Sequence, residues 1–114
     1  MIRKLSLVVA FAISAQAFAQ VPSHSRAEAL RCAAAALALS DISKIPEEKA
    51  KYQKRADAFL EPVIQQNKRD GVSDENFKNE FREVKESYKK QLDAFGGSTD
   101  QMLMAFEDVE DCGS

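Results

Sequence analysis

Apolar residues recur along this chain at helical spacing, in four segments that are separated by turn signals. The clearest segment covers residues 74–95, where apolar positions follow one another at intervals of 4, 3, 4, 4 and 3 residues. That spacing places them in one stripe along a helix, with charged residues on the opposite side. Gly96 and Gly97 then end the segment. The stripe consists of Phe77, Phe81, Val84, Tyr88, Leu92 and Phe95.

A first helix is predicted over residues 26–40. Ser25 followed by Glu28 is the sequence pattern of a capping box, in which each side chain bonds to the backbone of the other. Residues 33–36 are all Ala, which favours helix and lets a neighbouring helix approach closely. The apolar positions are Leu30, Ala33, Ala34 and Leu37 on one side, with Cys32, Ala36 and Leu39 beside them.

A second helix is predicted over residues 46–69, because Pro46 suits a first helical turn and Gly71 suits a left-handed cap. Pro62 cannot donate a backbone hydrogen bond, so we expect a kink there or two shorter helices that meet. The apolar face consists of Tyr52, Ala56, Phe59, Leu60, Val63 and Ile64.

The last helix is predicted over residues 99–111. Ser98 and Gln101 have the spacing of a second capping box at its start. We expect its buried face to consist of Met102, Leu103, Phe106 and Val109.

Short connections between these helices favour antiparallel neighbours. The pattern therefore predicts an all-α fold, a small up-down four-helix bundle formed by residues 20–114 as a single domain. The alternative is a three-helix core with a short N-terminal helix packed over it.

Residues 1–19 have the layout of a secretory signal peptide. Two cations precede a short apolar run, and Ala17-Phe18-Ala19 forms an A-x-A cleavage site. A membrane anchor needs roughly 20 apolar residues, and Ser14 interrupts this run too early. We therefore expect export to the periplasm, with secretion to the extracellular space as the alternative, and no membrane association after cleavage.

The charge balance excludes some partners. Lys and Arg number 16 and Asp and Glu number 18, which gives a net charge of −2. Loss of Arg3 and Lys4 with the signal peptide leaves the rest of the chain more acidic, and it contains no basic cluster. Such a chain is a poor candidate for binding nucleic acid or anionic lipid.

Cys32 and Cys112 are the two cysteines of the chain. Export would place both in an oxidising compartment, where a pair of cysteines forms a disulfide. In an antiparallel bundle the first and last helices are neighbours, so we predict one intramolecular Cys32–Cys112 disulfide that staples the fold.

The C-terminal segment, residues 98–114, is acidic and contains no Lys or Arg. Four acids sit at the end of the last helix, where the helix dipole disfavours negative charge. One interpretation is a solvated end that Arg26 and Arg31 partly neutralise. The other is a partner-binding acidic patch, made of Glu107, Asp108, Glu110 and Asp111.

Candidate chemistry is sparse. His24 is the single histidine and lies close to the expected N-terminus of the exported chain, where we expect a frayed end. Two distant cysteines and one histidine do not have the clustered spacing of a zinc site, and no glycine-rich phosphate loop is present. We expect no cofactor, no metal site and no catalytic residue, so the chain is interpreted as a non-enzyme.

These observations favour an exported helical protein that acts by binding another protein, of the inhibitor, immunity or secretion-accessory type. The size and the single cysteine pair are loosely similar to periplasmic acid-stress chaperones, a likeness of layout without a shared motif. That likeness implies an alternative function, which is to hold unfolded client proteins under stress. A small hydrolase is the remote alternative.

Overall fold

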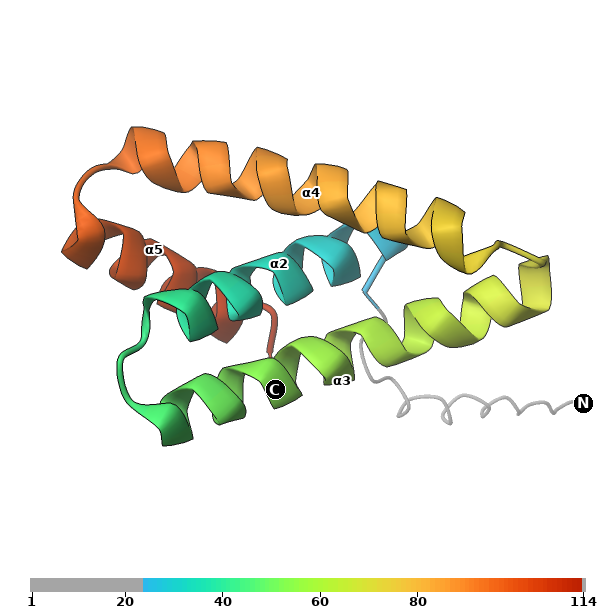
Figure 1. Cartoon of the computed structure of the whole chain (residues 1–114), viewed down its shortest axis with the longest axis horizontal. Coiled ribbons are helices and arrows are strands. Elements are labelled where there is room, and N and C mark those ends of the chain that lie inside the picture. The colour runs from blue at the N-terminus through green and yellow to red at the C-terminus, as the bar shows by residue number, and fades with distance from the viewer. Residues whose placement is uncertain (1–23, 114) are drawn as a thin grey trace, which may run out of the picture.

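Residues 24–113 of the computed structural model, the part that the structure describes, form four helices joined by short connections. Figure 1 shows these helices and their order along the chain. The predicted signal peptide, residues 1–19, lies outside the described residues. The helices are α2 (Arg26–Ile42), α3 (Pro46–Asp70), α4 (Asp74–Phe95) and α5 (Ser98–Asp111).

The predicted capping signals define the ends of the first three helices. The Ser25 hydroxyl accepts a hydrogen bond from the Glu28 N–H at 3.1 Å, and the Ser25 N–H donates to the Glu28 carboxylate at 3.0 Å. The hydrogen bond from the Ser25 N–H to the Glu28 carboxylate lowers the pKa of that carboxyl group. Ser73 accepts from the Asn76 N–H at the start of α4. Gly71 ends α3 with a φ of 74°, a left-handed conformation that favours glycine.

The predicted capping box at the start of α5 is wrong. Ser98 is already the first helical residue, and Gly97 occupies the cap position without a side-chain bond. The Gln101 side chain instead donates to the Gly96 carbonyl at 2.9 Å. Because Ser98 lies inside the first turn of α5, its side chain does not occupy the cap position. Helix α5 therefore begins one residue earlier than predicted.

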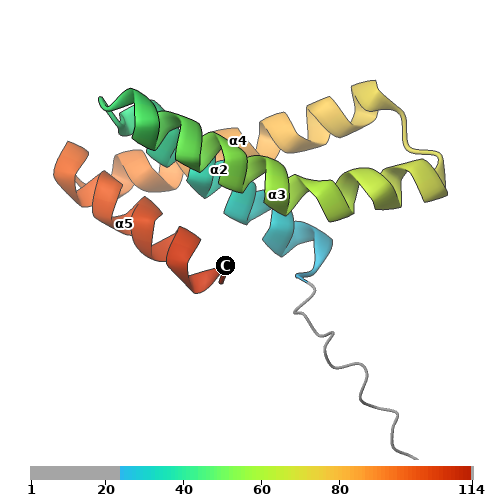
Figure 2. The ribbon, with the colours of Figure 1, turned by 90° about the horizontal axis from the view of Figure 1, so that it is seen from below.

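Pro62 lies inside α3 and does not divide it into two helices. Figure 2 shows the axis of α3 changing direction near its middle. The missing backbone donor therefore bends one continuous helix, which is the first of the two outcomes predicted for this proline.

Helix α2 is the centre of the packing, and it contacts each of the other three helices. Figure 1 shows it between α3 and α4, with α5 beside it. The all-Ala run allows this arrangement. Ala33, Ala35 and Ala36 are fully buried, and their small side chains let the neighbouring helices lie close to α2. The chain is thus an all-α bundle, in which the first helix lies at the core rather than over the other three.

The predicted disulfide is confirmed. Cys32, on α2, is bonded to Cys112, directly after α5, and their Cα atoms are 6.2 Å apart. The bond joins the central helix to the end of the chain across a sequence separation of 80 residues.

The α4 stripe is buried as predicted over most of its length. Phe81, Tyr88 and Leu92 are buried, and Phe77 and Val84 are packed against the core. The prediction is wrong for Phe95, which keeps 57% of its surface exposed. Phe95 is the last residue of α4, where the chain turns into the glycine connection, and none of the four described helices buries it.

Candidate functional site

The surface of α5 that points away from the bundle is apolar in its first half. Met102, Leu103 and Phe106 are all exposed, and Leu103 keeps 55% of its surface accessible. Phe106 follows Leu103 by three positions and Met102 by four, so the three side chains are neighbours on one side of the helix. We call these three residues the α5 outward face. Large apolar side chains that gather on a surface mark interaction sites.

The sequence pattern predicted the α5 outward face to be buried together with Val109, and for the outward face this is wrong. Helix α5 buries Ala105 and Val109 instead. Cys112 follows Val109 by three positions and Ala105 by seven, so it lies on the same side of the helix. The disulfide to Cys32 therefore fixes which side of α5 meets α2. Two small residues there also let α5 approach α2 closely.

Asp108, from the predicted acidic patch, is bonded within the fold. Its carboxylate accepts a hydrogen bond of 2.5 Å from the Tyr88 hydroxyl and lies 3.4 Å from the Arg31 guanidinium. Arg31 also stacks over the Tyr88 ring, 4.9 Å from its centre. Burial, together with the bond to Asp108, raises the pKa of Tyr88. This three-residue cluster joins α2, α4 and α5 beside the disulfide.

The other three acids of the predicted patch are exposed. Glu110 lies 3.9 Å from the guanidinium of Arg55, on α3. Glu107 and Asp111 form no ion pair with any residue in the range 24–113. The structure therefore separates the predicted patch into one partly buried carboxylate that is bonded within the fold, one that is loosely paired, and two that face solvent.

Arg55 is a contributor that the sequence interpretation missed. Its guanidinium donates to the Val109 carbonyl at 3.4 Å and to the Gly113 carbonyl at 3.1 Å, at the C-terminal end of α5. It thus satisfies carbonyls and offsets the negative end of the helix dipole where the acids gather. No local signal marks Arg55, because its partners lie more than fifty positions away along the chain.

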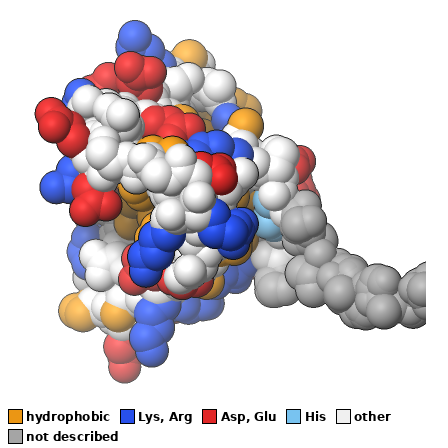
Figure 3. All heavy atoms as spheres, turned by 90° about the vertical axis from the view of Figure 1, so that its right-hand side faces the viewer, with side chains coloured by type: hydrophobic (Ala, Val, Ile, Leu, Met, Phe, Trp, Pro, Cys, Tyr) orange, Lys and Arg blue, Asp and Glu red, His pale blue; other side chains and the backbone are white. Residues whose placement is uncertain are grey.

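Arg26 does not neutralise the acidic end, contrary to the prediction. It forms a two-point ion pair with Glu80 on α4, at 2.7 and 2.9 Å, and donates to Gln66 and the buried Asn67 on α3. The hydrogen bond from Arg26 lowers the pKa of Glu80. These contacts close the end of the bundle near the α3–α4 connection. Figure 3 views the molecule from that end and shows acidic and basic side chains interspersed over it.

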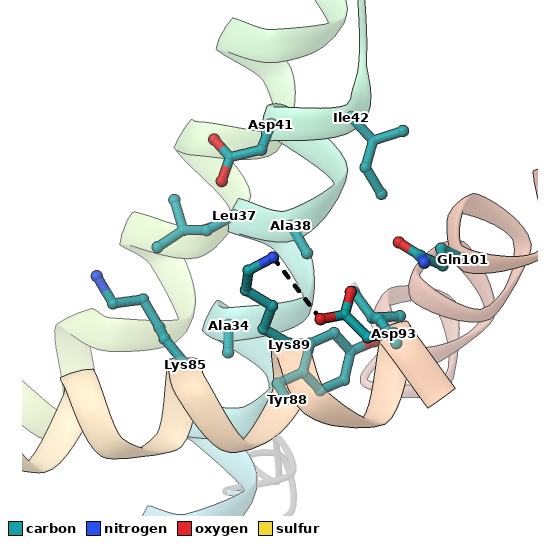
Figure 4. A pocket seen from close by; sticks show the side chains of 11 residues that line it. Ala34, Leu37, Ala38, Asp41, Ile42, Lys85, Tyr88, Lys89, Asp93 and Gln101 are labelled. Carbon is teal, nitrogen blue, oxygen red and sulfur yellow. Dashed lines mark ion pairs between the residues drawn. The ribbon is translucent and has the colours of Figure 1, made fainter. Parts of the chain in front are cut away.

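A groove of about 220 Å³ opens between α2, α4 and the first turn of α5, and Figure 4 shows its lining. Leu37 and Ile42 contribute apolar surface from α2, and the Lys89–Asp93 ion pair of 3.8 Å stands at the α4 side. Both signs of charge occur around its rim. The groove could take an apolar side chain, but its rim selects neither an anion nor a cation.

His24 lies at the edge of the described chain and packs edge-on against the ring of Phe59, with ring centres 6.0 Å apart. It lines a shallow hollow beside the disulfide together with Glu28, Asp108 and Asp111. Within the described residues, no hydrogen bond or ion pair joins His24 to these carboxylates. The hollow therefore brings acids and a histidine near one another without the bonded geometry of an acid–base pair.

The described chain offers no group of three or more His, Cys, Asp or Glu side chains that could hold a metal ion. None of the four described helices is long and apolar enough to cross a membrane. Comparisons with known proteins identified no relative, since no family model, no curated protein and no solved structure matches this chain.

Proposed function

We propose that this protein is exported to the periplasm and acts there without catalysis, by binding another protein through the α5 outward face. The observation that carries this proposal is the exposure of Met102, Leu103 and Phe106. A fold with so few large apolar residues would stabilise itself by burying all three, so their placement outside favours a use in binding.

The proposed location rests on two features. The N-terminal layout of residues 1–19 is typical of a secretory signal, and a structural disulfide is typical of oxidising compartments. Intact-mass measurement of the exported protein tests this part. A chain that begins at Gln20 is the expected result, and retention of residues 1–19 would refute it.

Site-directed photo-crosslinking in living cells tests the binding surface. A photoreactive side chain placed at position 103 should give one discrete covalent adduct with another protein. The matched control is position 68 on α3, where the native Lys68 is exposed and lies near the α3–α4 connection, at the end of α3 that is away from α5 (Figure 1). Equal adduct yields at the two positions, or no adduct at either position, would contradict the proposed binding surface.

One observation favours the second candidate function, a stress chaperone that holds unfolded clients. Carboxylates join helices at two places, in the Arg26–Glu80 pair and in the Asp108 cluster with Arg31 and Tyr88. The ion pair with Arg26 lowers the pKa of Glu80, so acid that protonates Glu80 would weaken the first of these links and expose apolar surface. Binding of a hydrophobic dye that stays unchanged as the pH falls from about 7 to about 3 would remove this candidate.

A further inference from the structure

The charge that surrounds the α5 outward face indicates the chemistry of the partner. This inference rests on the proposed function and concerns the same surface. The exposed Asp100 lies before the outward face along α5, and the exposed Glu107, Glu110 and Asp111 follow it. Of these four acids, only Glu110 has a cation within 4 Å in the described chain, and that distance is 3.9 Å.

No cation of α5 itself balances this charge, because residues 98–114 contain no Lys or Arg. Arg31 and Arg55 reach the segment from other helices, but their bonds go to Asp108 and to backbone carbonyls at the end of α5. The side that α5 presents to solvent is therefore apolar in its first half and acidic in its second.

Charge also decides among the possible occupants of this surface. A second copy of the chain, packed through the same face about a two-fold axis, would bring two acidic segments without cations together. An anionic lipid surface would be repelled in the same way. A partner that combines apolar and basic side chains would satisfy both halves of the surface.

We propose that the α5 outward face binds a basic amphipathic helix of another protein. Two or three large apolar side chains of that helix would cover Met102, Leu103 and Phe106. Its Lys or Arg residues, about one to two turns further along, would face Glu107 and Glu110, which follow Leu103 by four and seven positions on the same side of α5. Helix-on-helix recognition of this kind uses apolar anchors at positions i, i+3, i+4 and i+7.

A defined peptide tests this chemistry. The probe is a fluorescent amphipathic peptide of Leu and Lys, about 18 residues long so that it can form a helix, and its counterpart replaces every Lys by Glu. Binding to the exported protein, with its disulfide intact, is followed by fluorescence anisotropy. The Leu/Lys peptide should bind, the Leu/Glu peptide should not, and binding should weaken between about 50 and about 500 mM salt.

Paired variants locate the binding. Leu103→Ser should weaken binding of the Leu/Lys peptide at least about tenfold, whereas Ile45→Ser, which alters a side chain of the same 55% exposure at the α2–α3 connection, should leave it within about twofold. Glu107→Lys should weaken binding by about three- to tenfold, and Glu86→Lys, at an exposed position on α4, should not. All four positions are exposed, so each variant should fold.

The possible failures are distinguishable. Equal losses from Glu86→Lys and Glu107→Lys would mean general attraction between opposite charges and would overturn the inference. Binding of both peptides, lost in Leu103→Ser, would overturn the basic partner and leave the α5 outward face as a binding surface. A dimer in sedimentation equilibrium that Leu103→Ser dissociates would identify a second copy as the occupant. Failure of the crosslinking experiment at position 103 would instead remove the proposed function itself.

Discussion

Helices α3 and α5 both pack against the central helix α2, but they are held by different forces. Helix α3 buries large or close-fitting apolar side chains in the interface, among them Tyr52, Ala56 and Val63. One reciprocal polar contact supports it near the connection, where Lys49 and Ser40 each donate to the other's carbonyl. The side of α3 that meets α2 is therefore the side that the hydrophobic effect selects.

Helix α5 buries only Ala105 and Val109. Its position depends on the Cys32–Cys112 bond, on the Asp108 cluster and on the bonds from Arg55 to its last carbonyls. These links orient the helix so that Met102, Leu103 and Phe106 stay outside, while Met104 packs against the core, partly buried. The difference shows that a covalent bond and a few polar contacts can hold a helix in an orientation that hydrophobic burial alone would reverse.

The largest loss of stability is expected from a substitution in the interface between α3 and α2. Val63→Asp places an unpaired carboxylate where only 3% of the native side chain is exposed. The cost should exceed about 5 kcal/mol, comparable with the whole stability of a small domain. Circular dichroism at room temperature should show loss of helix. Native-like melting of this variant would mean that α3 is not held by burial.

Removal of the disulfide should have the next largest effect. In the double variant Cys32→Ser, Cys112→Ser, the loss of loop closure should cost on the order of 4–5 kcal/mol. Because α5 buries so little apolar surface, the hydrogen-exchange rate of its backbone amides should rise more than that of the α3 amides. Equal acceleration in both helices would show that α5 is not the separately fastened element described here.

Tyr88→Phe should have a moderate effect that depends on pH. It removes the donor to Asp108 and should cost about 1–2 kcal/mol at neutral pH. In the folded state the pKa of Tyr88 is raised, so the native protein keeps the phenol proton that the unfolded chain releases above about pH 10. Native stability from this group is therefore complete below that pH and is lost as the pH rises.

Urea unfolding at a series of pH values measures this effect. The native protein should lose stability between about pH 9 and about pH 11, and Tyr88→Phe should lose less over the same range. Identical slopes for the two proteins would show that the Tyr88–Asp108 bond does not form in solution.

The smallest effect should come from Leu103→Asp, which makes the same kind of change as Val63→Asp but on the α5 outward face. Its side chain is 55% exposed, so the free energy of unfolding should change by less than about 0.5 kcal/mol. A melting temperature that falls as far as that of Val63→Asp would place Leu103 in a buried interface.

Local features of the fold were predictable from the sequence. The capping box of Ser25 and Glu28, the glycine cap at Gly71 and the α4 stripe depend on neighbours within a few positions, and the structure confirms them. The disulfide was predictable because two cysteines allow a single intramolecular pairing. These inferences require no knowledge of how distant segments meet.

The orientation of α5 was not predicted, because size was used to choose its buried side. The large residues Met102, Leu103 and Phe106 compete with a side made of Ala105, Val109 and Cys112, and the cysteine decides between them. The side of α5 that carries Cys112 must face Cys32 on α2, and this constraint predicts the observed buried side. The roles of Arg26 and Arg55 had no such signal, since their partners are brought close only by the folded chain.

Solvent exposure of individual methyl groups tests the central claim most directly. In an NMR experiment with a soluble paramagnetic agent, the Met102 and Leu103 methyl groups of the disulfide-bonded protein should broaden strongly, while those of Val63 and Val109 should not. That result is expected because Met102 and Leu103 are exposed on α5, whereas Val109 on the same helix and Val63 on α3 are buried. Protected Met102 and Leu103 methyl groups together with an exposed Val109 would contradict the orientation of α5 and the binding surface inferred from it.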